Sequence, residues 1–492
     1  MSRRHPKDLI LPHLAVTDAA ARGKSVAHAP DGRAVLIEGA GPGDTVDVRV
    51  TKKNARYYEG RVENILSYSD KRTDPPCPHF GVCGGCRWQN MQYPWQLHYK
   101  QQEVENNLRR IGGLELPPAE PILGCDQAFY YRNKLEYSFA DRRWYTREEL
   151  DAAGTIDTYE PALGFHIQGR WDKVLDVRQC LLQPDPSGAI RDHIRKYALE
   201  NGLEFFNPRT NEGFLRTIMI RISATTAEVM LLVQFGREDA PAREALLEDL
   251  ARHFPQITSL LYAINPKVND SVYDLDIRTY SGSDHIYEQM EDLRFRIGPK
   301  SFFQTNTRQA LRLYATVRDF AALTGTENVY DLYTGTGTIS QFVSRRAGKV
   351  VGVEAVPEAI QAARENAARN NIDNCQYLVG DMKDVFDDAF VARYGQPDVV
   401  ITDPPREGMH KDVVAQLLRL APERIVYVSC NPATQARDLA LMDGLYRVEK
   451  IQPVDMFPQT FHVENVVLLS RREVPKTTSQ GEPSEKKDDE SL

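Results

Sequence analysis

The sequence predicts an α/β protein whose two ends follow different architectures. After about residue 300, strand-like apolar runs alternate with amphipathic helical segments, which predicts a doubly wound, mostly parallel sheet. Before residue 68, short strand-like runs are separated by glycine-rich turns, which predicts a five-stranded barrel of the OB type. The chain has 492 residues, enough for about three domains. A central region of mixed α/β character is therefore expected between the two ends.

The overall composition indicates a globular chain that stays out of the membrane. Apolar residues make up 41% and charged residues 26%, which are ordinary globular values. No stretch approaches the roughly 20 apolar residues of a membrane span. The N-terminus, MSRRHPKDLILPHLAV, has neither the long apolar run nor the cleavage site of a signal peptide. We therefore expect a cytoplasmic monomer with no membrane partner.

The N-terminal barrel is expected to begin near residue 7 and to end at residue 68. Its clearest strands are residues 23–29, 32–39, 44–53 and 57–67. Residues 1–72 carry 13 Lys and Arg against 9 Asp and Glu, whereas the whole chain has a net charge of −8. Cations and aromatic residues gather near one end of the barrel, which either binds single-stranded nucleic acid or forms a solvated strand edge. These residues are Lys52, Lys53, Arg56, Tyr57, Tyr58 and Arg61.

A loop at residues 73–98 holds three of the seven cysteines. An odd number of cysteines in a chain without an export signal does not indicate a disulfide framework. Cys77, Cys83 and Cys86 follow the spacing C-x5-C-x2-C, and Cys180 follows after 93 intervening residues, with Cys125 competing for the fourth place. Four thiolates suit zinc or an iron–sulfur cluster. Three close cysteines and one distant one fit a [4Fe-4S] cluster better, because the paired CxxC motifs of a zinc ribbon are absent.

The central region, residues 121–300, is predicted to contain antiparallel strands. Its strand-like runs are residues 131–140, 217–223, 228–236 and 259–265. A helix is expected before it, from about 95 to 111, ending at the glycine pair 112–113. Residues 141–162 are polar and are predicted to form an inserted loop.

The C-terminal region alternates regularly. Strands are predicted at residues 328–333, 349–355, 376–381, 397–403 and 424–430, and helices at residues 306–324, 340–346, 357–370, 411–421 and 433–442. The last two strands, at 446–457 and 462–472, have no helix between them, which predicts an antiparallel edge.

The ends of the predicted parallel strands carry polar residues that suit a nucleoside. In such sheets the ligand lies beyond the carboxyl ends of the strands. The first strand ends in a two-glycine turn at 331–337, and the next ends in Glu354, an acid that can bind both hydroxyls of a ribose. Asp381 and Asp403 end the following two strands. Singly, Glu354 could be a solvated helix cap and Asp381 an N-cap. Together they favour S-adenosylmethionine over NAD, because the GxGxxG pattern is absent.

Cys430 ends the fifth strand, at the same edge as the predicted nucleoside site. A thiolate that adds to carbon 6 of a uracil turns carbon 5 into a nucleophile able to accept a methyl group, and a base then removes the carbon-5 proton. Glu464 is the leading candidate for that base, and His462 is the reserve. The alternative for Cys430 is a buried core thiol.

Five motifs carry a resemblance to a known family: SFFQTN (301–306), DLYTGTG (331–337), TDPPREG (402–408), VSCNPAT (428–434) and FPQTFHVENVVLL (457–469). Together they resemble the RNA uridine-5-methyltransferases, most closely the 23S ribosomal RNA enzymes. The barrel resembles a TRAM domain, and the cysteine loop resembles that of the iron–sulfur branch of the family. The chain departs from the family pattern at Thr338, where asparagine is common, and at Phe461, where glycine is usual.

The resemblance implies a Rossmann-like class I methyltransferase domain that uses S-adenosylmethionine. It implies Cys430 as nucleophile and Glu464 as base, with Phe302 and Phe303 near the target base. It implies that the cofactor and uracil pocket is lined by Gln304, Tyr333, Glu354, Asp381 and Asp403. It further implies that a [4Fe-4S] cluster is bound by Cys77, Cys83, Cys86 and Cys180.

We therefore predict four segments: an RNA-binding barrel at 1–68, a central domain at 69–300, a methyltransferase domain at 301–474 and a disordered tail at 475–492. The predicted function is methylation of carbon 5 of a uridine in RNA. The expected substrate is 23S rRNA, since the common bacterial tRNA enzymes of the family lack both barrel and cysteine loop. The alternatives are the T-loop of tRNA as substrate, or a non-catalytic RNA-binding factor in ribosome assembly.

Overall fold

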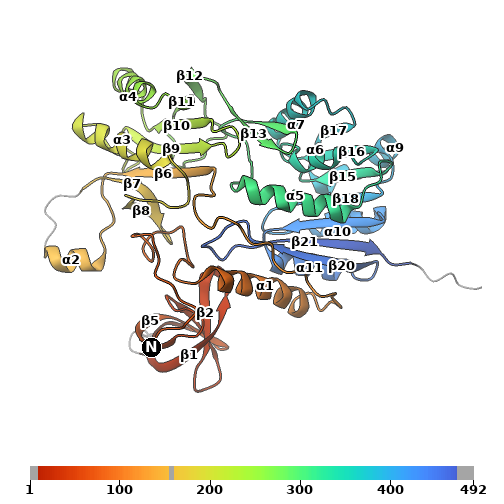
Figure 1. The fold of residues 1–492 in the computed structure, drawn as a ribbon, viewed down its shortest axis with the longest axis horizontal. Helices are drawn as coiled ribbons and strands as arrows, with labels where there is room; N and C mark the ends of the chain where they lie inside the picture. The colour runs from red at the N-terminus through yellow and green to blue at the C-terminus, as the bar shows by residue number, and fades with distance from the viewer. Residues whose placement is uncertain (1–8, 155–159, 474–492) are drawn as a thin grey trace, which may run out of the picture.

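The computed structural model describes residues 9–154 and 160–473. Its elements form a small barrel, a central mixed sheet and a C-terminal doubly wound sheet (Figure 1). The predicted tail at 475–492 lies outside the described residues. No helix in the described ranges is long and apolar enough to cross a membrane.

The N-terminal unit is a closed barrel with the strand order β1-β2-β3-β5-β4, as predicted. Its strands are β1 (Ile10–Ala20), β2 (Lys24–His28), β3 (Ala34–Glu38), β4 (Thr45–Lys53) and β5 (Tyr57–Ser67). Alternating residues point inward, so that Val35, Ile37, Val46 and Val48 have no exposed surface. Strand β1, whose bounds do not follow from the sequence pattern, closes the barrel against both β2 and β4.

Helix α1 (Tyr93–Arg110) connects the barrel to the rest of the molecule. It begins with a proline in its first turn, where a missing N–H costs nothing, and ends before the glycine pair, as predicted. Its apolar residues Val104 and Leu108 are fully buried against the C-terminal sheet. In Figure 1, α1 runs between the barrel and the strands β20 and β21.

The central sheet has seven strands in the order β12-β11-β10-β9-β6-β7-β8. They are β6 (Lys134–Ala140), β7 (Ala162–Ile167), β8 (Arg170–Asp176), β9 (Leu215–Ile222), β10 (Val229–Phe235), β11 (Ile257–Ile264) and β12 (Arg278–Gly282). Helices α3 (Ser187–Glu200) and α4 (Ala240–His253) cover one face. All pairs are antiparallel except β10 with β11, which α4 connects as a crossover. The polar segment 141–162 contains a short helix, α2 (Arg147–Ala153), and its residues 155–159 lie outside the described ranges.

The C-terminal sheet has the order β17-β16-β15-β18-β19-β21-β20, with its last two strands antiparallel, as predicted. Its strands are β15 (Asn328–Leu332), β16 (Lys349–Glu354), β17 (Cys375–Val379), β18 (Val399–Thr402), β19 (Arg424–Ser429), β20 (Tyr446–Val454) and β21 (Glu464–Arg471). The helices are α5 (Thr307–Ala321), α6 (Thr338–Ser344), α7 (Pro357–Arg369), α8 (Met382–Val385), α9 (Asp388–Tyr394), α10 (Lys411–Leu420) and α11 (Pro432–Met442). The strand order reverses between β15 and β18, which is where such sheets bind their ligands.

A two-stranded hairpin, β13 (Ile286–Met290) and β14 (Leu293–Ile297), lies between the two large sheets. Phe295 of the hairpin belongs to the same buried cluster as Val317 of α5 and Phe342 of α6. Met230 and Leu232 of the central sheet belong to that cluster too. The central and C-terminal sheets thus share one continuous core.

Candidate active site

Cys430 and Glu464 are brought together by the pairing of β19 with β21. Ser429 lies opposite Asn465 in this antiparallel pair. Cys430 follows the end of β19 and Glu464 begins β21, so the two residues adjoin this last pair at the same edge of the sheet, and the charge of Glu464 acts on the Cys430 thiol. Glu464 is opposite Val454 of β20, so its backbone is held there. The carboxyl side chain is 5% exposed.

Burial keeps the acidic groups of this site protonated at unusually high pH. Burial raises the pKa of Glu464 well above its ordinary value, and the nearby Asp403 raises it further. The pKa of Asp403 is raised to about 7 by burial and by Asp331. The pKa of the Cys430 thiol is raised to about 11 by burial, and the charges of Glu464 and Asp403 add to that effect. Arg406 acts in the opposite direction on both Cys430 and Glu464.

Arg406 had no role in the sequence analysis, and the structure ties its loop to the Cys430 turn. Asn431 Nδ2 donates a hydrogen bond of 2.9 Å to the carbonyl oxygen of Arg406, and Thr434 Oγ1 donates another of 3.1 Å. Asn431 Oδ1 accepts the backbone N–H of Ala433 and caps α11. The asparagine therefore fixes the turn after the cysteine and joins it to the loop that follows β18.

The glycine turn after β15 is fastened to Glu354 at the end of β16. Gly335 N–H donates to Glu354 Oε2 at 3.2 Å, and Val356 N–H donates to Oε1 at 3.0 Å. Gly337 has φ +75°, and a Cβ there would lie 2.7 Å from the Tyr377 hydroxyl, so this position requires glycine. Tyr333 has φ +61°, a strained conformation for a non-glycine residue. Such strain at a strand end is typical of a binding site.

Asp331 anchors this turn from within the sheet. Its Oδ2 accepts the Thr334 hydroxyl at 2.5 Å and also the Ser340 hydroxyl. The side chain is 1% exposed, and burial raises its pKa to about 6. A buried acid at the start of the DLYTGTG motif could have been singled out from the sequence, but only the structure shows what it binds.

The remaining predicted residues lie in different surroundings. Asp381 is exposed, and its carboxylate accepts the backbone N–H of Lys383. These contacts are those of a helix N-cap at the start of α8, the second of the two roles expected for this residue. Gln304 is buried, and its backbone carbonyl oxygen accepts a hydrogen bond of 2.9 Å from Asn133 Nδ2. Phe302 is 67% exposed, whereas Phe303 is 4% exposed and packs in the core near Phe295. The ring of Phe303 thus fills the core beneath the 301–306 segment, and of the two phenylalanines expected near the target base Phe302 is the exposed one.

The loop that leads to Glu464 is held by residues outside the C-terminal sheet, which the sequence analysis missed. Gln96 of α1 donates to Gln459 Oε1 at 3.0 Å and accepts the Gln459 N–H at 2.9 Å. The carbonyl of Gln459 accepts the N–H groups of Arg87 and Trp88, at 2.8 and 3.0 Å. We call residues 455–462 the base loop. His462 lies in this loop, and burial lowers its pKa to about 4, so the imidazole is neutral near pH 7.

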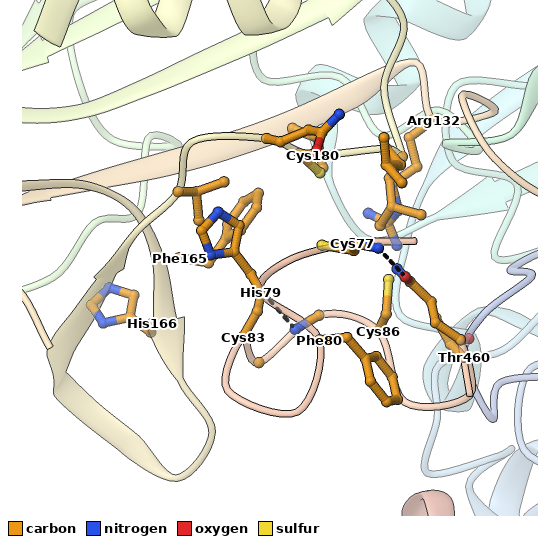
Figure 2. Close-up of a pocket in the computed structure, with 18 of the residues that line it drawn as sticks. Cys77, His79, Phe80, Cys83, Cys86, Arg132, Phe165, His166, Cys180 and Thr460 are labelled. Atoms are coloured by element: carbon orange, nitrogen blue, oxygen red, sulfur yellow. Dashed lines mark hydrogen bonds between the residues drawn. The ribbon is translucent and has the colours of Figure 1, made fainter. Parts of the chain in front are cut away.

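The four cysteines of the predicted cluster line one cavity of about 550 Å³. Figure 2 shows Cys77, Cys83, Cys86 and Cys180 around this space, with Arg132 and Thr460 at its edge. Cys125 lies elsewhere, where its thiol donates to the Asp455 carbonyl at 3.1 Å. Among the described residues, no three of the cysteine sulfurs lie within 4.8 Å of one another.

Comparisons with known proteins agree with this architecture. A family model described as tRNA (Uracil-5-)-methyltransferase matches residues 281–472, and a TRAM domain model matches residues 14–62. An uncharacterized RNA methyltransferase of Bacteroides thetaiotaomicron is 51% identical over 92% of this chain and 100% of its own length. One from Porphyromonas gingivalis is also 51% identical, over 93% of this chain and 99% of its own.

One solved structure matches nearly the whole fold. The crystal structure of the Pyrococcus abyssi tRNA (uracil-54, C5)-methyltransferase in complex with S-adenosyl-L-homocysteine has a TM-score of 0.71 and 27% identity, and it covers 93% of this chain and 100% of that one. The fold and site are those of an S-adenosylmethionine-dependent RNA methyltransferase. More particularly, the chain belongs to the RNA uracil-5-methyltransferase family, with an N-terminal TRAM barrel.

Proposed function

We propose that this enzyme methylates carbon 5 of a uridine in 23S rRNA through a covalent bond between Cys430 and carbon 6. The observation that carries the proposal is that the last pair of β19 and β21, Ser429 with Asn465, brings their neighbours Cys430 and Glu464 to one sheet edge, where the charge of Glu464 acts on the thiol. S-adenosylmethionine supplies the electrophilic methyl group. Glu354, Tyr333 and the glycine turn are the residues that would bind its nucleoside part.

The protein's own groups account for the remaining steps. The Cys430 thiol gives its proton to solvent and its sulfur bonds to carbon 6, so that the electron pair of the ring double bond moves to carbon 5. Carbon 5 takes the methyl group, and S-adenosylhomocysteine is the leaving group. Glu464 in its carboxylate form then removes the carbon-5 proton, the ring double bond forms again, and the bond between sulfur and carbon 6 breaks to release the methylated base. Burial makes this carboxylate a stronger base than one in water, and the charge of Arg406 favours its ionised form.

A second candidate substrate is tRNA, because the solved relative that matches the fold over its full length acts on uracil 54 of tRNA. The resemblance of the five sequence motifs to the 23S rRNA enzymes supports rRNA, whereas the barrel does not separate the two substrates, because the solved tRNA enzyme covers 93% of this chain. The test is to map 5-methyluridine in rRNA and tRNA from cells with and without the gene. Loss of a methylated position in 23S rRNA alone is expected. Loss in tRNA alone would replace the proposed substrate, and no loss in either RNA would contradict the proposed function.

We also propose that the four cysteines hold a [4Fe-4S] cluster. In such a cluster each thiolate binds a different iron, so that the sulfurs lie further apart than around one zinc ion, where bonds are about 2.3 Å long. No three cysteine sulfurs in the described ranges lie within 4.8 Å of one another, which is not the arrangement around one zinc ion, and the four line a single cavity of about 550 Å³. Burial raises the pKa of Cys83 to about 11 and that of Cys86 to about 12, so these thiols need a bound cation to ionise near pH 7.

The cluster is tested by iron and sulfide content and by the visible absorbance of protein purified without oxygen. Cys180→Ser is expected to lose the absorbance band, whereas Cys125→Ser, its matched control, is expected to keep it. Stoichiometric zinc without iron in the wild-type protein would refute the cluster. Equal loss in both variants would remove the assignment of Cys180.

A further inference from the structure

A second large cavity lies between the barrel and the cysteine loop. Its volume is about 1230 Å³, and it is lined from the barrel by Arg22, Lys24 and Gly39, from the following segment by Tyr68 and Arg72, and from the cysteine loop by Phe80 and Arg87. We call this cavity the barrel groove. It is separate from the predicted surface around Lys52, Lys53 and Arg56, none of which lines it.

The cations of the barrel groove are only partly neutralised. Lys24 forms an ion pair of 2.9 Å with Glu59, and Arg72 forms one of 2.6 Å with the buried Asp44. Within the described ranges, the side chains of Arg22 and Arg87 form no ion pair. Arg22 is exposed and Arg87 is half-buried. Two guanidinium groups are therefore available to an anionic ligand. Two acidic residues, Glu38 and Asp74, lie on the same lining.

An exposed aromatic ring lies on the same lining as these cations. Tyr68 is 70% exposed, and the guanidinium of Arg72 lies 5.1 Å from the centre of its ring. An exposed aromatic ring and unpaired cations in one groove suit single-stranded nucleic acid, because bases stack on the ring while phosphates bind the cations. A peptide partner would not need this combination.

Two residues of the groove lining, Gly23 and Arg87, also contact the base loop. The backbone N–H of Arg87 donates to Gln459 of that loop at 2.8 Å. Gly23, on the groove lining, packs so closely that a Cβ there would lie 3.2 Å from both Arg87 and Phe461. A nucleic acid chain in the groove would therefore lie against the segment that positions Glu464.

We propose that the barrel groove binds a single-stranded segment of the RNA substrate that flanks the target uridine, with Arg22 and Arg87 on phosphates and Tyr68 stacked on a base. This inference rests on the proposed function, and it names the part of the protein that holds the RNA outside the reaction site. It also gives the cysteine loop a role: one side of that loop lines the cysteine cavity and the other lines the groove, with Cys86 on both linings.

The test is binding of a fluorescent single-stranded oligouridylate, measured by anisotropy over a series of salt concentrations. Arg22→Met and Arg87→Met are each expected to weaken binding several-fold and to reduce the slope of log K against log salt by about one. Tyr68→Leu is expected to weaken binding about fivefold or more without changing the slope, because stacking releases no counterions. Arg237→Met, at a cation that follows β10 and pairs with Glu204, is the control and is expected to bind like the wild type.

Unchanged affinity and slope in both arginine variants would overturn the proposal, and so would an equal loss in Arg237→Met. If Arg87→Met does not fold, the exposed positions Arg22 and Tyr68 decide the outcome. Anisotropy requires no methyl transfer. If the wild-type protein binds the oligouridylate through these residues but methylates neither rRNA nor tRNA, the result would contradict the proposed function and would leave the RNA-binding role of the barrel groove intact.

Discussion

Lys100 of α1 and Asp455 of the base loop form an ion pair of 2.6 Å in which neither side chain has any exposed surface. Lys100 Nζ also donates to the Phe457 carbonyl at 3.0 Å, and Asp455 accepts the Tyr93 hydroxyl at 2.9 Å. Nine residues after Asp455 the chain reaches Glu464. A helix that precedes the central sheet thus fixes the conformation of the loop that carries the candidate base.

Breaking this pair is expected to destabilise the whole fold. In Lys100→Met the carboxylate of Asp455 loses its buried counterion, which costs about 3–5 kcal/mol. The free energy of unfolding, measured in urea, should fall by that amount. Lys196→Met, at a lysine whose side chain is 73% exposed, is the control and should change stability little. An unfolding curve for Lys100→Met that overlays the wild type would show that the pair contributes nothing to stability.

Glu464→Gln is expected to accumulate a covalent complex between protein and RNA. After methyl transfer the carbon-5 proton has no base to accept it, so that the bond from Cys430 to carbon 6 cannot break. A band that resists denaturation should appear on gels when RNA and S-adenosylmethionine are both supplied. Turnover should fall by about 10²–10⁴-fold, the usual contribution of a general base.

The double variant Cys430→Ala/Glu464→Gln is the matched control for this adduct. It should show no such band, because it has no nucleophile. A band of equal intensity in the double variant would place the covalent bond on another residue. Cys430→Ala alone should abolish methylation, and activity retained in that variant would contradict the covalent mechanism.

The reactivity of Cys430 toward iodoacetamide should follow its raised pKa. Since the thiolate is the reactive form, alkylation at Cys430 should keep rising up to about pH 11 in the free enzyme. Glu464→Gln removes a charge that raises this pKa, so the curve should move to lower pH. Mass spectrometry of the Cys430 peptide separates its signal from those of the other six cysteines. A curve that levels off at the pH of an ordinary thiol would refute the electrostatic description of the site.

Sequence and structure agree where periodicity or a short motif determines the element. Local patterns predict the alternating buried and exposed residues of β4, the start of α1 at a proline, and the succession of strands and helices after residue 300. The fold class could therefore be predicted. The contacts of the base loop could not, because Gln96 and Gln459 are 363 positions apart and neither belongs to a pattern. The burial of Phe303 could not be predicted for a related reason: the motif identifies the segment, but the core beside Phe295 decides which phenylalanine points inward.

Asp403 should make stability fall as pH rises. Its folded-state pKa of about 7 lies above the ordinary 3.8, so the folded protein binds this proton more tightly than the unfolded chain does. The contribution is fully present below about pH 4 and is lost as pH rises through about 7. The stability of wild type relative to Asp403→Asn should therefore decrease by several kcal/mol across that window. The pKa of the exposed Asp381 is lowered, so the corresponding comparison with Asp381→Asn should change in the opposite direction.

Alanine variants of two glycines can distinguish the effect of the contact between the barrel and the base loop from the effect of backbone strain. Gly23 and Gly32 both have positive φ, +72° and +83°, so alanine at either position costs about 1–3 kcal/mol in strain. A Cβ at Gly32 meets nothing within 4 Å, whereas one at Gly23 lies 3.2 Å from Arg87 and Phe461. Both variants should lose stability, but only Gly23→Ala should also lower the rate of methylation, because the displaced Phe461 belongs to the loop that positions Glu464. Single-turnover rates at saturating RNA measure the difference. Equal rates in the two variants would mean that the contact of Gly23 with Arg87 and Phe461 does not influence the position of Glu464.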